Sequence, residues 1–187
     1  PADSQDQDAP ECSHTDDGLI LDYPDLKDAE GIQTGIRVQV EIRPGGFDEF
    51  TLSMQIENSG PRTVIDATFP LVGGWHEHTK QDRIALGANA FIEPRSLEPS
   101  AGNNYARNGR RQAWRYPVFM SCPWVDVSTP QGGLSYSNYM PEGNNGKFWI
   151  ENLAGYGDDF RLMFGWSHHL ALSPGDSWTS PLMALAV

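Results

Sequence analysis

Apolar and polar residues alternate strictly in two stretches of the chain, 36–43 (IRVQVEIR) and 50–57 (FTLSMQIE). Alternation with a period of two places every apolar side chain on the same face of a β-strand. The turn signal Pro44-Gly45-Gly46 lies between the two stretches. The pattern therefore predicts an antiparallel hairpin that buries one face.

Further strands are predicted along the rest of the chain. A third strand is expected over residues 63–69. Runs rich in aromatic and β-branched residues predict later strands over 134–139, 148–153, 160–172 and 178–187. Segments rich in glycine, proline and aspartate separate these runs, and the sequence contains neither a convincing amphipathic helix nor a repeat of fixed period. We predict an all-β fold, an antiparallel two-sheet β-sandwich with a long irregular loop region.

The irregular region is residues 70–117, which are rich in Gly, Asn, Pro and Arg and show weak periodicity. Residues 101–112 (AGNNYARNGRRQ) are expected to form a long loop, and long loops in compact domains are usually functional or disordered. With 187 residues, the chain has the length of a single domain. We predict an acidic N-terminal arm at 1–17 and one β-sandwich domain at 18–187.

Charge is unevenly distributed. The formal net charge is −12, and residues 1–30 contain ten acidic residues and one base, Lys27. A negative surface disfavours nucleic acid and anionic membranes as partners. The sequence contains no stretch approaching the roughly 20 apolar residues of a membrane span. The chain opens with polar residues and shows no signal peptide.

The two cysteines, Cys12 and Cys122, are too few for a disulfide framework and show no zinc-binding spacing. We expect the pair to form one disulfide bond that ties the arm to the domain if the protein is exported. A secreted or periplasmic location is the expectation.

Aromatic side chains in and beside the irregular region are candidates for ligand binding, because loops on a rigid scaffold often carry binding residues. An indole or phenol ring stacks on a sugar ring while neighbouring polar groups bond its hydroxyls. The simpler alternative is that these rings cap the ends of the sandwich. The predicted ligand-binding residues are Asn104, Tyr105, Arg107, Arg110, Trp114, Tyr116 and Trp124.

Basic and metal-binding residues provide two further hypotheses. An arginine cluster (Arg95, Arg107, Arg110, Arg111 and Arg115) suits an anionic ligand, although pairing with the acidic arm or simple solvation is the simpler interpretation. His76 and His78 would share one side of a strand, as two ligands of one metal ion do. A structural or surface role for both histidines is the favoured interpretation. We expect no cofactor, although Asp158, Asp159 and Asp176 offer loop oxygens for a structural calcium ion.

Two segments carry a family resemblance. The run 50–60 (FTLSMQIENSG) followed by 64–70 (VIDATFP), and Arg115-Tyr116-Pro117 followed by 132–136 (GGLSY), are similar to patterns in the β-sandwich modules that precede the catalytic barrel of certain multidomain glycoside hydrolases. These modules resemble the galactose-mutarotase-like supersandwich, and endo-α-N-acetylgalactosaminidase-like enzymes are one example. The similarity extends over roughly residues 35–187, with departures at Val118 and Ser135. The catalytic carboxylates of those enzymes lie on the barrel, so the resemblance implies an accessory or carbohydrate-binding module.

Three functions follow as hypotheses. The first is a non-catalytic carbohydrate-binding module of an exported glycan-degrading system, whose partners are a polysaccharide or oligosaccharide and a catalytic domain of the same parent protein. The second is a small carbohydrate-active enzyme, a lyase, epimerase or hydrolase, with its site in the 75–116 loops and with His76, His78, Arg107 or Tyr116 as acid, base or charge stabiliser. The third is a structural interaction domain. The sequence contains no nucleophile elbow, P-loop or G-x-G-x-x-G motif.

Overall fold

The fold is that of a computed structural model of the full chain, which describes residue 2 and residues 7–46, 48–75, 83–88, 95–96, 111–130, 132–139, 146–152 and 162–186. These residues form fourteen β-strands and no helix. The strands build two antiparallel sheets with a shared apolar core. The predicted all-β, two-sheet sandwich is therefore confirmed.

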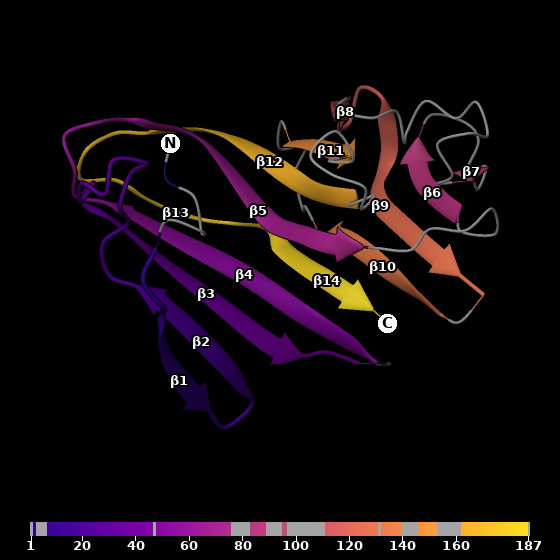
Figure 1. The fold of residues 1–187 in the computed structure, drawn as a ribbon, viewed down its shortest axis with the longest axis horizontal. Coiled ribbons are helices and arrows are strands. Elements are labelled where there is room, and N and C mark those ends of the chain that lie inside the picture. Colours follow the sequence, from indigo (N-terminus) through magenta and orange to yellow (C-terminus); the bar gives the residue numbers. More distant parts are fainter. Residues whose placement is uncertain are drawn as a thin grey trace.

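The larger sheet contains ten of the described strands (Figure 1). Nine follow the order β1-β2-β3-β4-β14-β10-β9-β6-β7, and β13 also pairs with β4. Their bounds are β1 Glu11–Thr15, β2 Gly18–Tyr23, β3 Ile36–Pro44, β4 Glu49–Asn58, β6 Arg83–Ala88, β7 Arg95–Ser96, β9 Met120–Thr129, β10 Gly132–Tyr139, β13 Ser177–Thr179 and β14 Leu182–Ala186.

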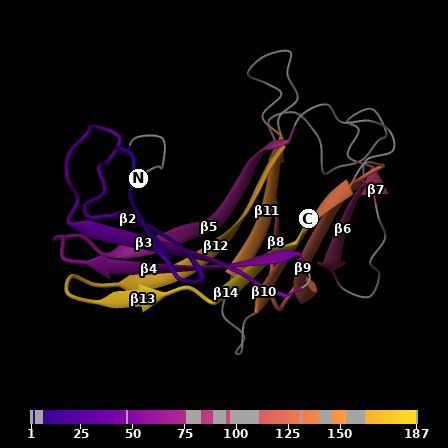
Figure 2. The same ribbon diagram turned by 90° about the horizontal axis from the view of Figure 1, so that it is seen from below.

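The smaller sheet has the order β5-β12-β11-β8. Its strands are β5 Val64–Trp75, β8 Arg111–Arg115, β11 Gly146–Asn152 and β12 Leu162–Leu172. Figure 2 shows the long strands β5 and β12 running side by side away from β3 and β4. Because β5 follows β4 in the chain, the connection between them carries the chain from the larger sheet to the smaller one.

The hairpin predicted at 36–57 is present as β3 and β4, which pair from Ile36 opposite Asn58 to Pro44 opposite Phe50. Leu52, Met54 and Ile56 are buried on the side that faces the smaller sheet, while the intervening positions point outward. This hairpin fixes the register of the larger sheet, since a slip by one residue would move the whole apolar row to solvent.

The core lies between the two sheets and is built from aromatic and aliphatic side chains of both. Phe148 and Trp166 of the smaller sheet are fully buried, as are Tyr136 and Met183 of the larger one. Burial of each such side chain stabilises the fold by about 1.5–3 kcal/mol. Phe148, Phe164 and Trp166, three aromatic residues of the predicted strands, belong to this core, whereas Trp149 is buried outside it and Phe160 lies outside the described residues.

The Asn58-Ser59-Gly60 turn that contributes to the family resemblance has a structural role. Asn58 Nδ2 donates to the carbonyl oxygens of Arg62 (2.8 Å) and Leu172 (3.0 Å), and Asn58 Oδ1 accepts from the Gly60 N–H (3.1 Å). A Cβ atom at Gly60 would clash with the carbonyl oxygen of Thr34. The buried Asn58 therefore ties the end of β4 to the end of β12, and only glycine fits the close approach.

The structure corrects several boundaries. The strand expected over 63–69 extends to Trp75 as β5, and residues 83–88 and 95–96 of the region expected to be irregular form β6 and β7. Residues 11–15, expected in the acidic arm, form β1 against β2, and residues 111–115, partly expected in a loop, form β8. The last predicted strand is two strands, interrupted where the Ser180 N–H bonds the Met54 carbonyl. All five residues of β1 are exposed, so no alternation of apolar residues marked this strand in the sequence.

Candidate functional site

Most of the predicted ligand-binding loop lies outside the described residues. This applies to Asn104, Tyr105, Arg107 and Arg110, and also to the metal candidates His76 and His78. The described members of the predicted site are therefore Trp114, Tyr116 and Trp124.

Trp114 and Tyr116 pack against the core. Strand β8 pairs with β11, which places Trp114 opposite Phe148 on the inner face, where the two rings stack with centroids 5.9 Å apart. The ring of Tyr116 lies 6.4 Å from that of Trp166. Both rings are half-buried. This packing gives both rings a structural role, and a contact with a sugar is open only to the exposed part of each ring.

Trp124 occupies a different environment, on the outer face of the larger sheet. Its neighbours in β9, Val125 and Val127, are fully buried toward the core. Because side chains alternate along a strand, Trp124 points to the opposite side. It lies opposite Ser137 of β10 and is half-buried.

A second ring lies close to Trp124 on the same outer face. Tyr139 follows Ser137 by two residues, so the two aromatic residues are diagonal neighbours, about 7–8 Å apart between Cα atoms. Tyr139 is 51% exposed and lies opposite Leu182 of β14, which is 45% exposed. The polar neighbours are Asp126 and Ser135, whose hydroxyl donates to Asp126 Oδ1 at 2.7 Å.

We call this group the aromatic face; it consists of Trp124, Asp126, Ser135, Ser137, Tyr139 and Leu182. Strands β9, β10 and β14 contain no lysine and no arginine, and Asp126 is their one acidic residue. Small residues adjoin the rings, since Ser137 stands opposite Trp124 on one side and opposite Ala184 on the other. The result is two flat apolar surfaces beside one carboxylate and two hydroxyl groups.

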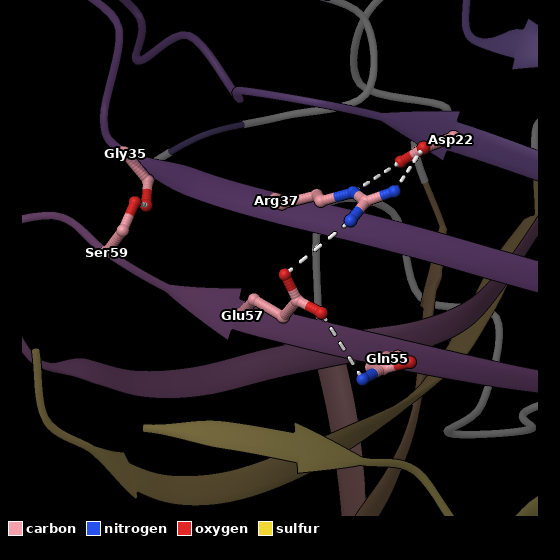
Figure 3. Close-up of polar contacts among 6 residues, drawn as sticks. All are labelled: Asp22, Gly35, Arg37, Gln55, Glu57 and Ser59. Atoms are coloured by element: carbon pink, nitrogen blue, oxygen red, sulfur yellow. Dashed lines mark hydrogen bonds and ion pairs between the residues drawn. The ribbon is translucent and has the colours of Figure 1, made fainter. Parts of the chain in front are cut away.

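The outer face of β2, β3 and β4 has a different composition (Figure 3). The Arg37 guanidinium bonds Asp22 through Nε (3.0 Å) and an Nη atom (2.7 Å), and a second Nη atom lies 3.7 Å from Glu57. Arg43 bonds Glu41 at 2.6 Å and lies 3.5 Å from Asp17. Gln55 donates to Glu57 at 3.5 Å.

We call these outward residues of β2–β4 the ion-paired face: Asp22, Arg37, Glu41, Arg43, Gln55 and Glu57. The hydrogen bonds from Arg37 lower the pKa of the Asp22 carboxyl below its usual value, because they stabilise the charged form. Both arginines of this face thus contact carboxylates of the protein, and their charge is largely compensated.

The interior holds polar groups that need explanation. His168 is buried, and its Nε2–H donates to the carbonyl oxygen of Phe69 at 3.1 Å. Burial lowers the pKa of His168 to about 4. Among the described residues, no partner is found for His168 Nδ1, Trp166 Nε1 or the side-chain amide of Asn138. Because neighbouring residues of a strand point to opposite faces, the adjacent His169 points to the outer side. Its Nδ1 lies 2.7 Å from Asp66 there.

The predicted disulfide between Cys12 and Cys122 is not formed, and both thiols are free and exposed. Cys12 lies on β1 and Cys122 on β9, with β2, β3, β4, β14 and β10 between them. At about 4.8 Å per strand, the separation along the sheet is roughly 25–30 Å, whereas a disulfide requires Cα atoms within about 7 Å.

Within the part of the chain that the structure describes, no group of three or more His, Cys, Asp or Glu side chains is placed to hold a metal ion. Asp176, one of the calcium candidates, caps its own turn, since its Oδ2 accepts from the Ser173 N–H at 2.9 Å. Asp158 and Asp159 lie outside the described residues. The same described residues include no helix long and apolar enough to cross a membrane.

Sequence reasoning named Trp124 but missed Tyr139, Asp126 and Leu182. Because side chains alternate along a strand, Ser135, Ser137 and Tyr139 share the face opposite to the buried Tyr136, and this pattern can be read from the sequence. The pairing of β10 with β9 and β14, which brings the two rings together, cannot be read from the sequence.

No protein-family model matches the chain, and no curated protein matches its sequence. Among solved structures, the chain is similar to a TPR-domain containing protein from Parabacteroides distasonis, with a TM-score of 0.55 and 12% identity. The match covers 94% of this chain and 33% of that protein, so the chain spans about a third of the other's length. At this level of identity the similarity concerns the fold alone.

Proposed function

We propose that this domain is a non-catalytic carbohydrate-binding β-sandwich, an accessory module of an exported glycan-degrading system. The observation that carries the proposal is the aromatic face, where Trp124 and Tyr139 lie on one side of a rigid sheet beside Asp126. Strands hold side chains more firmly than loops do, so this surface is already arranged for a ligand.

The chemistry of the face suits a sugar. The C–H groups on one side of a sugar ring are apolar and pack on an aromatic ring, while sugar hydroxyls both donate and accept hydrogen bonds. Asp126 Oδ1 already accepts from Ser135, and its second oxygen takes no part in that bond. The Ser135 and Ser137 hydroxyls offer further polar contacts at the edge of the rings.

The same residues argue against hydrolysis at this face. A glycosidase of the usual type needs two carboxyl groups on either side of the scissile bond. Strands β9, β10 and β14 supply one, Asp126. We expect the purified domain to release neither reducing ends nor unsaturated products from a glycan that it binds.

The accessory role and the extracellular or periplasmic location are parts of the same proposal. The family resemblance described above supports them. The solved TPR-domain protein offers a parallel, because a domain of similar fold makes up about a third of that longer chain. The proposed partners are accordingly a polysaccharide or oligosaccharide and a catalytic domain of a parent protein.

A glycan array followed by calorimetry on the best ligand tests the proposal. Trp124→Ala should weaken binding about tenfold or more without lowering the melting temperature by more than a few degrees. Phe119→Ala is the control, because Phe119 is an exposed aromatic residue (59%) that lies in the turn before β9 and not on the aromatic face. Binding that Phe119→Ala weakens and Trp124→Ala leaves unchanged would place the ligand elsewhere, and an array without any bound glycan would reject the function.

A structural interaction domain is a second candidate, because β1 is an exposed edge strand. All five of its residues are exposed, and the edge that does not face β2 offers backbone N–H and C=O groups to another strand. Replacing His14 by proline would remove one backbone donor from the free edge, because His14 and Leu19 form a non-hydrogen-bonded pair beside the two-residue turn and the His14 N–H points away from β2. A protein partner whose affinity falls with His14→Pro, together with a silent glycan array, would favour this candidate.

The enzyme hypothesis retains one described residue, Tyr116, whose ring packs on Trp166. Product analysis on the bound glycan distinguishes it from the proposal above. Turnover that survives purification and is lost in His76→Ala or Tyr116→Phe would establish an enzyme with its site in the 75–116 segment.

A further inference from the structure

We infer that the ligand of the aromatic face is an uncharged glycan of at least two sugar units, and that this face discriminates against acidic sugars. The inference rests on the proposed function and names the substrate class of the same site. Its basis is the charge of the side chains on β9, β10 and β14, the strands that carry the two rings or border them.

The aromatic face lacks cationic side chains of its own strands. β9, β10 and β14 contain no lysine or arginine, while Asp126 contributes a negative charge beside Trp124. Recognition of a carboxylate, sulfate or phosphate group normally uses the fork of arginine or the ammonium group of lysine. Among the side chains of these three strands, an acidic sugar would therefore meet a carboxylate and no cation; on the neighbouring strand β6, the register places Arg83 opposite Ser128.

The arginines of the neighbouring ion-paired face are already engaged. Arg37 contacts Asp22 and Glu57, and Arg43 contacts Glu41. An anionic ligand would have to displace these protein carboxylates to bond either arginine.

The hydrogen-bonding capacity of Asp126 also favours an uncharged glycan. The carboxylate of Asp126 accepts hydrogen bonds and cannot donate them. A neutral sugar presents hydroxyl donors to it, whereas the charged group of an acidic sugar presents only acceptors. The diagonal arrangement of Trp124 and Tyr139 provides two stacking positions. One monosaccharide cannot stack fully on both rings, so a ligand that uses both needs at least two sugar units.

The test uses the full chain and matched pairs of oligosaccharides. Neutral gluco-, manno- and galacto-oligosaccharides are compared with the same compounds oxidised to carboxylates at C6, at two salt concentrations. We expect the neutral member of the best pair to bind at least tenfold more tightly, with an affinity that changes little between low and high salt. Binding should also increase from the monosaccharide to the disaccharide.

Two variants show whether the discrimination arises at this face. Asp126→Asn keeps an acceptor oxygen and removes the charge, so it should reduce the preference for the neutral member by improving the affinity for the acidic one. Arg37→Gln, on the ion-paired face, should leave the preference unchanged.

The outcomes separate the inference from the proposed function. A preference for the acidic member that weakens with salt and is abolished by Trp124→Ala would overturn the inference and leave carbohydrate binding in place. A neutral preference that Asp126→Asn does not alter would also overturn it, since the discrimination would then arise elsewhere. If neither member of any pair binds, the proposed function itself fails.

Discussion

The two halves of the outer face of the larger sheet differ in how they satisfy their polar groups. On β2, β3 and β4, Arg37 is bonded to Asp22 and lies near Glu57, so the charges of this half contact one another. On β9, β10 and β14, Trp124 and Tyr139 accompany a single carboxylate, Asp126. The sheet is continuous, but its two halves present different chemistry.

This difference is the basis of the proposed binding site. Exposed ion pairs contribute roughly 0–1 kcal/mol and serve mainly to keep a sheet soluble. Flat side chains held apart on a rigid strand pair, in contrast, offer area that only a partner covers. We therefore propose the binding role for the half with fewer charges.

The first prediction concerns the core that supports both halves, and has the largest expected effect. The pKa of His168 is about 4 in the folded protein and 6.5 in the unfolded chain. As pH falls from 6.5 to 4, the unfolded state takes up the proton first, so stability should fall by up to about 3 kcal/mol. Below pH 4 both states are protonated and this loss ends.

Urea unfolding at several pH values measures this contribution. His168→Gln should flatten the decline between pH 6.5 and 4, while His169→Gln, at the exposed neighbouring position, should preserve it. If both halves belong to one cooperative fold, tryptophan fluorescence and circular dichroism should give coincident transitions. Separate transitions would show that the two halves are not comparable parts of one sheet.

The second prediction is directed at the aromatic face. Trp124→Ala should weaken glycan binding by on the order of 2 kcal/mol, about thirtyfold, because the ring supplies most of the stacking area. Tyr139→Ala should cost less, since its ring is at the end of the face beside Leu182. Calorimetry gives both values, and equal affinities for the wild type and the Trp124→Ala, Tyr139→Ala double variant would contradict the assignment.

The third prediction is directed at the ion-paired face. Arg37→Met should leave the free energy of unfolding nearly unchanged, because the pair with Asp22 is exposed to solvent. Glycan affinity should not change. The pKa of Asp22, which Arg37 lowers, should rise toward its ordinary value, and NMR titration of the Asp22 carboxyl measures this shift. A loss of glycan binding in this variant would show that the ion-paired face takes part in binding, which would contradict the proposed difference between the two halves of the sheet.

The fourth prediction has the smallest effect. Cys12 lies on β1, beyond the ion-paired face, and Cys122 lies on β9, in the half of the sheet that carries the aromatic face. Both are exposed. A thiol assay on the folded, unreduced protein should find two free thiols per chain, and reductant should leave the melting temperature unchanged. Detection of no thiol, with a reductant-dependent melting temperature, would show that the strand order between β1 and β9 is wrong.

Much of the fold could be predicted because its strands are strongly patterned. The β3–β4 hairpin was evident from its alternation, and the buried residues of β11 and β12 from their aromatic content. Strand β1 was missed because all its residues are exposed, so that only its pairing with β2 identifies it. The local pattern of apolar and polar residues identifies a strand that buries one face, but not a strand whose residues are all exposed.

The site was less accessible to sequence reasoning for a related reason. Trp114 was expected in an open loop, but pairing of β8 with β11 turns it onto Phe148. Tyr139 was not considered, although alternation about Tyr136 gave its orientation. Proximity between Trp124 and Tyr139 depends on the register of β9 and β10, which is a long-range property of the sheet.

An NMR titration of the isotopically labelled chain with the best neutral oligosaccharide tests the central claim most directly. The account predicts shifts in the Trp124 indole N–H and in the backbone amides of β9, β10 and β14, while the amides of β2, β3 and β4 and the Arg37 side chain stay in place. Shifts concentrated on β2–β4, with the Trp124 indole unaffected at saturation, would contradict it.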